Sequence, residues 1–188
     1  MIQTELFTSL YKFCEGKIEI RPIPGEQAFF DIDDLDGIVS HCQQYETSNL
    51  YFGVATRSGL PDREGKTGGK NNIVHIPCVW CDLDFKTTPR EVAAQNLKKF
   101  PFKPSIIVKS GGGIHLYWFL KELAEKHDIE VIEDVTHRIA DKLGGDHGAC
   151  DAARVLRVPG TKNRKYNPAP LCEVTQQNEF YYTLNDFL

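Results

Sequence analysis

The stretch VWCDLDFK, residues 79–86, places two carboxylates one residue apart at the end of an apolar run. Its β-branched and aromatic residues predict a strand. Since successive side chains of a strand point to opposite faces, Asp82 and Asp84 are expected to share one face with Trp80 and Cys78. Two ionised carboxylates side by side repel each other unless a cation lies between them. The pair alone therefore predicts either solvated aspartates or a divalent-cation site. The opposite, core-facing side of the strand would carry Val79, Cys81, Leu83 and Phe85.

The segments on either side of this strand predict an α+β fold rather than a doubly wound parallel sheet, because two strands separated by three glycines have the spacing of an antiparallel hairpin. Asp33 is expected to cap the first helix and Thr88 the second. Residues 58–72 are rich in glycine and charge, and they predict a mobile loop. Besides the strand at 73–85, strands are predicted at 17–23, 28–32, 49–56, 104–110, 114–120, 170–176 and 179–184, and helices at 34–45, 89–99 and 125–143.

Length and composition indicate a single domain, residues 1–188. A net charge of −4 argues against a broad, sequence-blind coat for nucleic acid. No apolar run approaches the roughly 20 residues of a membrane span, and no leader pattern precedes the first strand. The six cysteines are too sparse for a disulfide scaffold. We therefore expect a cytoplasmic protein with reduced thiols that does not bind a membrane.

A second motif, KSGGGIHLYW, presents a histidine on a strand directly after a glycine run. Glycines let the backbone approach a ligand closely, and the run exposes N–H groups. His115 is expected on the polar face of its strand, where Lys109 and Ser110 could help it to hold a phosphate. Taken alone, the motif fits a tight turn and a structural histidine better.

A third stretch, GGDHGACDAARVLRVPGTKNRK at 144–165, carries the densest basic cluster of an otherwise acidic chain. Arginine forks match phosphate oxygens in a bidentate manner. Asp146 and Asp151 each offer a third carboxylate for a metal site. Taken alone, the stretch fits a solvated basic loop equally well. The cluster consists of Arg154, Arg157, Lys162, Arg164 and Lys165.

Together these stretches resemble the archaeo-eukaryotic primase superfamily, in particular the primase-polymerases of phages, plasmids and other mobile elements. The family's D-x-D motif is matched by residues 82–84, and its strand histidine by His115, with Gly113 where many members carry serine. Its third motif is an aspartate before spaced arginines. Asp146 fits this spacing better than Asp151, and RVLRVPGTKNRK resembles the R-x-x-R-x-P-G-T-x-N-x-K signature of that branch. The resemblance covers roughly residues 49–165.

This resemblance implies a two-layer fold, in which an RRM-like antiparallel sheet has helices on one face and a small N-terminal α+β subdomain closes the nucleotide cleft. Within the single domain it implies an N-terminal part (1–48) and a core (49–188). It implies DNA primase or polymerase activity, which adds dNTPs or NTPs to a primer on a single-stranded DNA template. Asp82, Asp84 and Asp146 would hold two Mg²⁺ or Mn²⁺ ions. A fused or separate helicase, and a prokaryotic, viral or mobile-element origin, are also implied. Residues expected to contact the nucleotide are Arg57, Lys109, Ser110, Gly113, His115, Arg154, Arg157 and Lys165.

Three other hypotheses compete with this one. Cys78 and Cys81 have zinc-motif spacing, but an odd separation in a strand sends them to opposite faces, so no zinc is expected. A nicking-type replication initiator needs a paired-histidine metal site, and the chain has no H-x-H. A replication-initiator-type domain that binds nucleic acid without polymerase activity remains the alternative, although the carboxylates argue against it.

Overall fold

The computed structural model describes residues 1–188 as two mainly antiparallel sheets with α-helices packed against them. The first sheet has the strand order β2 (Ala28–Asp31), β1 (Lys17–Ile23), β3 (Asn49–Gly53), β7 (Val155–Arg157). The second sheet has the order β4 (His75–Asp84), β6 (Gly113–Glu125), β5 (Ile106–Lys109), β8 (Glu173–Gln177), and β9 (Tyr181–Tyr182) pairs with β6 in parallel. The helices are α1 (Glu5–Leu10), α2 (Leu35–Gln44), α3 (Arg90–Lys99) and α4 (Ile129–Leu143).

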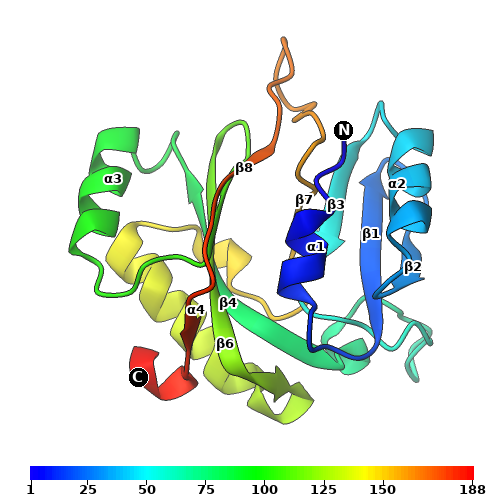
Figure 1. The fold of residues 1–188 in the computed structure, drawn as a ribbon, viewed down its shortest axis with the longest axis horizontal. Helices are drawn as coiled ribbons and strands as arrows, with labels where there is room; N and C mark the ends of the chain where they lie inside the picture. The colour runs from blue at the N-terminus through cyan, green and yellow to red at the C-terminus, as the bar shows by residue number, and fades with distance from the viewer.

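The layers are visible in Figure 1, where α3 and α4 lie on the outer side of the second sheet and α2 on the outer side of the first. The α4 helix follows the predicted apolar periodicity and ends at Gly144, which adopts a left-handed conformation with φ 80°. Tyr117 of β6 stacks on Phe52 of β3, with 6.5 Å between ring centroids. This contact joins the inner faces of the two sheets, and the expected α+β fold class is confirmed.

The β4–β6 pairing decides which residues face the first sheet. Directly paired residues of antiparallel strands share a face. Asp82 pairs with His115 and Trp80 with Tyr117, so all four point toward the first sheet. Trp80 and Cys78 are buried, although the sequence placed them on the face opposite the core-facing side. The first sheet covers this part of the face, and only the end of β4 with its two aspartates remains open.

Two helix starts differ from the sequence-based expectation. The cap of α2 is Asp34 rather than Asp33, and its side chain accepts a hydrogen bond from the Gly37 N–H. Thr88 does not cap α3, whose N-terminus has no side-chain cap. Its hydroxyl instead donates to the Gly144 carbonyl at 2.6 Å and so ties α3 to the end of α4. Local sequence alone does not distinguish these partners.

Two short elements were not expected from the sequence. They are α1, with six residues, and β7, which lies inside the basic stretch and pairs with β3. Because β3 and β7 complete the first sheet, the division expected at residues 48 and 49 falls inside one sheet. The loop at 58–72 contains one 3-10 turn and is held by the side chains of Asp62 and Asn72. None of the helices has the length and apolar character that crossing a membrane requires.

Candidate functional site

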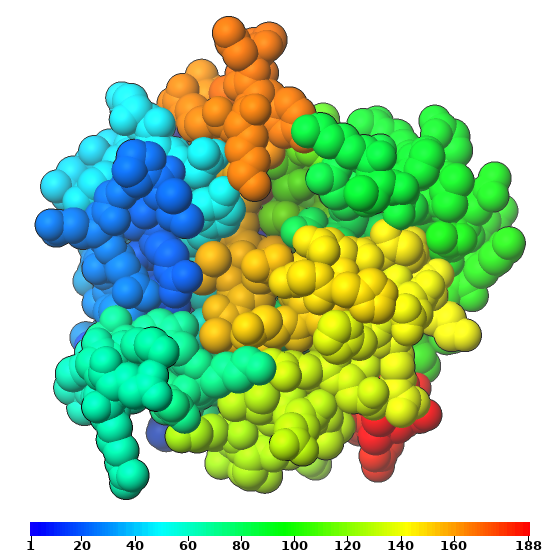
Figure 2. All heavy atoms as spheres, turned by 180° about the vertical axis from the view of Figure 1, so that it is seen from behind, coloured from blue at the N-terminus to red at the C-terminus, as the bar shows by residue number.

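A cavity of about 360 Å³ opens between the two sheets, where β4 ends and the antiparallel strand β6 begins. Figure 2 shows the molecule hollowed below a projecting segment (residues 160–170, orange), between N-terminal residues in blue and cyan and residues in green. The cavity gathers most of the residues of the three motifs, although they are far apart in the sequence. From the motifs it is lined by Asp82, Asp84, Ser110, Gly113, His115, Asp146, Arg154, Arg157 and Lys165.

The carboxylates reach the cavity from two elements. Asp82 and Asp84 come from the end of β4, while Asp146 lies in the loop after α4. The Asp146 N–H donates to the Asp82 carbonyl at 2.8 Å, and this bond fixes the loop beside the strand. Trp80 supports the same loop, because its indole N–H donates to the Ala149 carbonyl at 2.7 Å. The fold therefore brings the third carboxylate next to the D-x-D pair.

These carboxylates have the donor chemistry that Mg²⁺ and Mn²⁺ prefer, since all three supply oxygen. They are not assembled around one point, and no group of three or more His, Cys, Asp or Glu side chains is arranged to hold a metal ion. Asp146 Oδ1 accepts from the Gly148 N–H at 2.8 Å, and its Oδ2 lies 3.9 Å from Arg154 Nη2. The three carboxylates thus suit a divalent ion by their chemistry.

Asp151, the other candidate for the third carboxylate, does not line the cavity. Its Oδ1 accepts from the Ala153 N–H at 2.6 Å, in the turn before β7. This placement favours Asp146 for the site and gives Asp151 a role in shaping the turn that leads to Arg154.

His115 is nearly buried beside Asp82, with Nε2 3.6 Å from Asp82 Oδ1. Burial lowers the pKa of this histidine below its ordinary value. Asp82 opposes the shift, and the positive charges of Arg157 and Arg154 add to it. The imidazole is therefore neutral at neutral pH. Its Nδ1 is buried without a hydrogen-bond partner.

Arg157 is held in the wall of the cavity, and only 3% of its surface is exposed. Its Nη1 donates to Asn49 Oδ1 at 2.7 Å and its Nη2 to the Tyr51 hydroxyl at 3.2 Å. The guanidinium also lies over the Tyr51 ring, 4.9 Å from the centroid. Asn49 and Tyr51 were not predicted to belong to the site. The pairing of β3 with β7 brings them into the site, because it places Tyr51 opposite Arg157.

The glycine run has a structural role in the β4–β6 pairing. Gly113 pairs directly with Asp84, and a Cβ on it would overlap the Leu83 carbonyl oxygen. Strand pairing thus requires glycine at this position, which also lines the cavity. Gly112 leaves room for Tyr166 of the projecting segment, whose ring also lies 4.9 Å from Lys86 Nζ.

Two expected phosphate contacts lie away from the cavity. Lys109 is half exposed and lies 4.0 Å from Glu173 on β8. Arg57 is completely buried, with Nε 3.2 Å from Glu19 Oε2. Its remaining donors bind the Ala55 and Ala153 carbonyls. The structure gives Arg57 a place in the interior, where a nucleotide cannot reach it.

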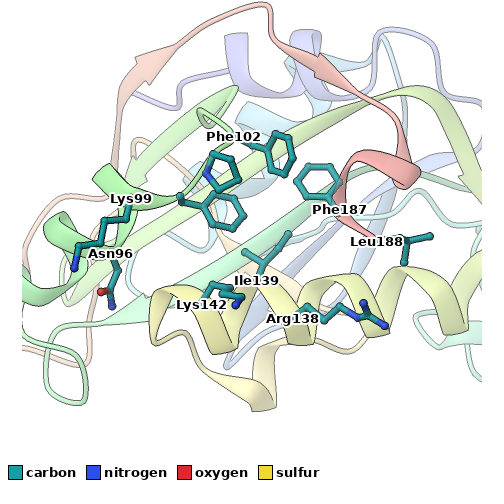
Figure 3. Close-up of a pocket in the computed structure, with 10 residues that line it drawn as sticks. Asn96, Lys99, Phe102, Arg138, Ile139, Lys142, Phe187 and Leu188 are labelled. Atoms are coloured by element: carbon teal, nitrogen blue, oxygen red, sulfur yellow. The ribbon is translucent and has the colours of Figure 1, made fainter.

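A larger cavity, of about 720 Å³, lies between α3, α4 and the C-terminal residues (Figure 3). Figure 3 shows Phe102, Phe187 and Ile139 around this space, and Lys99, Arg138 and Lys142 extending from the two helices. No aspartate or glutamate lines it. Because it lacks the carboxylates, it is not the candidate for the chemistry of the three motifs.

Residues 71–183 match the family model of the RepB DNA-primase N-terminal domain. The chain belongs to this family. A replication protein of Clostridium perfringens is 27% identical over 124 residues, which cover 61% of this chain and 30% of that protein. The RepB-type primase domain described here thus spans about a third of the length of the curated relative that it matches.

Solved structures share the fold of this RepB-type domain at low sequence identity. The AEP domain of the cyanophage S-2L primase-polymerase has a TM-score of 0.68 and 16% identity, covering 98% of this chain and 94% of that one. The catalytic domain of primase RepB′ in complex with initiator DNA has a TM-score of 0.63 and 11% identity, covering 97% and 90%. The family and these folds confirm the resemblance to mobile-element primases and identify a primase-type domain.

Proposed function

We propose that this RepB-type domain is a template-directed nucleotidyltransferase that adds nucleotides to a 3′-hydroxyl on a single-stranded DNA template. The observation that carries the proposal is the cavity between the sheets. It is lined by three carboxylates and by the basic side chains of Arg154, Arg157 and Lys165. A nucleoside triphosphate and its counter-ions require both kinds of group, with anionic oxygens for the metal and fixed cations for the phosphates.

In this proposal Asp82, Asp84 and Asp146 hold Mg²⁺ or Mn²⁺. Such ions, when bound, favour ionisation of the attacking hydroxyl and offset the charge of the leaving pyrophosphate. The protein contributes the placement of the ligands. Asp82 and Asp84 are fixed by the β4–β6 ladder, and the backbone bond from Asp146 to Asp82 keeps the third carboxylate within the same cavity.

Arg157 is proposed to orient the triphosphate. Its guanidinium is already held by Asn49 and Tyr51, so little side-chain entropy remains to be lost when a phosphate binds. Neutral His115 can donate one N–H to a phosphate oxygen without adding charge next to Asp82. Arg154 has fewer protein contacts than Arg157, with one ion pair, to Asp146, at 3.9 Å.

We propose single-stranded DNA as the partner along the rim of the cavity, where Lys86, Lys165 and Tyr166 lie. The RepB′ catalytic domain was solved with initiator DNA, and its fold matches this chain. Basic side chains beside an aromatic ring suit the phosphates and bases of a single strand. The overall charge of −4 makes this local contact, rather than the whole surface, the expected binding face.

The test is primer extension and de novo primer synthesis on single-stranded DNA, with Mg²⁺ or Mn²⁺ present. Asp82→Asn and Asp84→Asn should each abolish synthesis, and Asp146→Asn should reduce it strongly. Asp151→Asn is the matched control, since this aspartate lies outside the cavity. Each variant must keep the melting temperature of the parent chain. Unchanged synthesis by Asp82→Asn would refute the site.

The alternative is a replication-initiator-type domain that binds DNA without synthesis. The observation in its favour is that the three carboxylates are not assembled into a metal site. The two functions separate in one comparison. The alternative predicts binding to single-stranded DNA that does not depend on Mg²⁺ or Mn²⁺, together with no nucleotide incorporation at any metal concentration.

A further inference from the structure

We propose that His137 and His147 form a binding site for a transition-metal ion such as Zn²⁺, separate from the carboxylate cavity. His137 lies on α4, and His147 begins a 3-10 turn, His147–Ala149, in the loop that follows the helix. Their Nδ1 atoms are 3.1 Å apart. Neither residue lines the cavity between the sheets, and the inference does not depend on the proposed polymerase function.

The separation of the two nitrogens suits one shared ion. Zinc binds imidazole nitrogen at about 2.0–2.1 Å, so ligand angles between 90° and the tetrahedral value need nitrogens about 2.9–3.4 Å apart. The observed 3.1 Å lies within this range. Without metal, one proton joins the two nitrogens in a hydrogen bond. When an ion binds, His137 carries its proton on Nε2 instead of Nδ1, so both Nδ1 lone pairs are available and no net proton is released.

Asp141 orients one of the two ligands. Its Oδ1 lies 3.0 Å from His147 Nε2. A carboxylate in this place holds the ring proton on Nε2 and leaves the Nδ1 lone pair for the metal, which is the usual arrangement behind metal-bound histidines. Asp141 also supplies negative charge close to the ion. It is therefore a positioning residue and not a ligand.

The site is open and has two protein ligands, so water must complete the coordination. The His147 side chain is 55% exposed and that of Asp141 66% exposed. Two ligands agree with the absence of any three-residue group, and they predict modest affinity. Imidazole prefers Zn²⁺, Ni²⁺ and Cu²⁺ to Mg²⁺. The site is thus chemically distinct from an all-oxygen site at Asp82 and Asp84.

An ion at this position would add a metal link between α4 and the loop that follows it, which already contact each other through Thr136 and Cys150 and through Asp141 and His147. His147 directly follows Asp146, the carboxylate that the loop delivers to the cavity. Binding would fasten the loop to α4 and should raise the melting temperature of the chain, since a ligand that binds only the folded state stabilises it.

The test is calorimetric titration of the untagged chain with ZnCl₂, in an excess of MgCl₂ that occupies oxygen sites. We expect one Zn²⁺ per chain. His137→Asn and His147→Asn should each weaken binding at least tenfold, and Asp141→Asn about tenfold. The control is His127→Asn, which removes an exposed histidine that has carboxylates at 3.5 and 3.7 Å but no second histidine. This control should bind Zn²⁺ like the parent.

Two results would overturn the proposal. One is the absence of saturable Zn²⁺ binding below about 100 µM. The other is stoichiometric binding that survives both His137→Asn and His147→Asn, or that is lost in Asp82→Asn instead. Because His137 and His147 are exposed, both variants should fold, and unchanged melting temperatures without metal verify this.

Discussion

Replacing Arg57 with methionine should destabilise the fold, because this arginine is a buried structural residue. Arg57 and Glu19 are both fully buried, with Arg57 Nε 3.2 Å from Glu19 Oε2. Arg57 also donates to the Ala55 carbonyl at 2.9 Å and to the Ala153 carbonyl at 3.0 Å. The variant leaves these two carbonyls without that donor. It also leaves the Glu19 carboxylate in the interior with only Arg21 and a hydrogen bond from Gln27.

The expected loss follows from the uncompensated charge. Removing one partner of a buried ion pair costs about 3–5 kcal/mol. Arg21 still contacts Glu19, so the value should lie near the lower limit of this range. For a chain of this size, each kcal/mol shifts the melting temperature by about 2–4 °C, so a loss of about 3 kcal/mol gives a shift of roughly 6–12 °C. The total free energy of unfolding of a domain is only about 5–15 kcal/mol.

The assay is urea unfolding followed by the fluorescence of the two buried tryptophans. The double variant Arg57→Met/Glu19→Gln should recover part of the lost stability, because it removes the unpaired charge. If Arg57 bound phosphate instead, Arg57→Met would keep the parent's unfolding midpoint and lose nucleotide affinity. That pattern would show that the buried Arg57–Glu19 pair does not stabilise the fold.

Three further predictions concern strand pairing, the thiols and the arginine of the cavity. Gly113→Ala should cost about 1–3 kcal/mol in urea unfolding, because the added Cβ overlaps the Leu83 carbonyl. The control is Gly69→Ala, which should cost less, because Gly69 has a negative φ and its Cβ would make only an ordinary contact with Asn72. Burial raises the pKa of Cys42 to about 12. At pH 8 the native chain should therefore react with a thiol reagent far more slowly than the urea-unfolded chain, which should show six reactive thiols. Fast labelling of the native chain would contradict the assignment of buried thiols. Tyr51→Phe should weaken nucleotide binding, measured by fluorescence anisotropy, about tenfold at unchanged stability. The reason is that Arg157 loses one hydrogen bond that restrains its guanidinium. Equal affinity would count against the proposed role of Arg157 in orienting the triphosphate.

Strand alternation and helix periodicity predicted most of the fold, because both are local properties of the chain. The apolar face of α4 and the hairpin of β5 and β6 are examples. β7 was not predictable in the same way, since three residues carry no periodic signal and the strand exists through its pairing with β3. The burial of Trp80 also depends on the first sheet, which a single strand cannot reveal.

In the candidate site too, local sequence patterns predicted some residues, and strand pairing between distant segments placed the others. Asp82 and His115 were expected in one site, and their cross-strand pairing places them together. Tyr51 was missed because it joins the site only through β7. Arg57 ends a strand-like segment and resembles an exposed phosphate ligand, but its partner Glu19 lies on another strand. No local pattern shows that this charge is neutralised in the interior.

The most direct test of the central claim is a crystal structure with a nucleoside triphosphate and Mn²⁺, in which anomalous scattering locates the ions. The account predicts Mn²⁺ bound by Asp82 and Asp84, with Asp146 turned toward it and the phosphates against Arg157. A nucleotide bound in the cavity with no Mn²⁺ at these aspartates, or Mn²⁺ held by other residues, would contradict it.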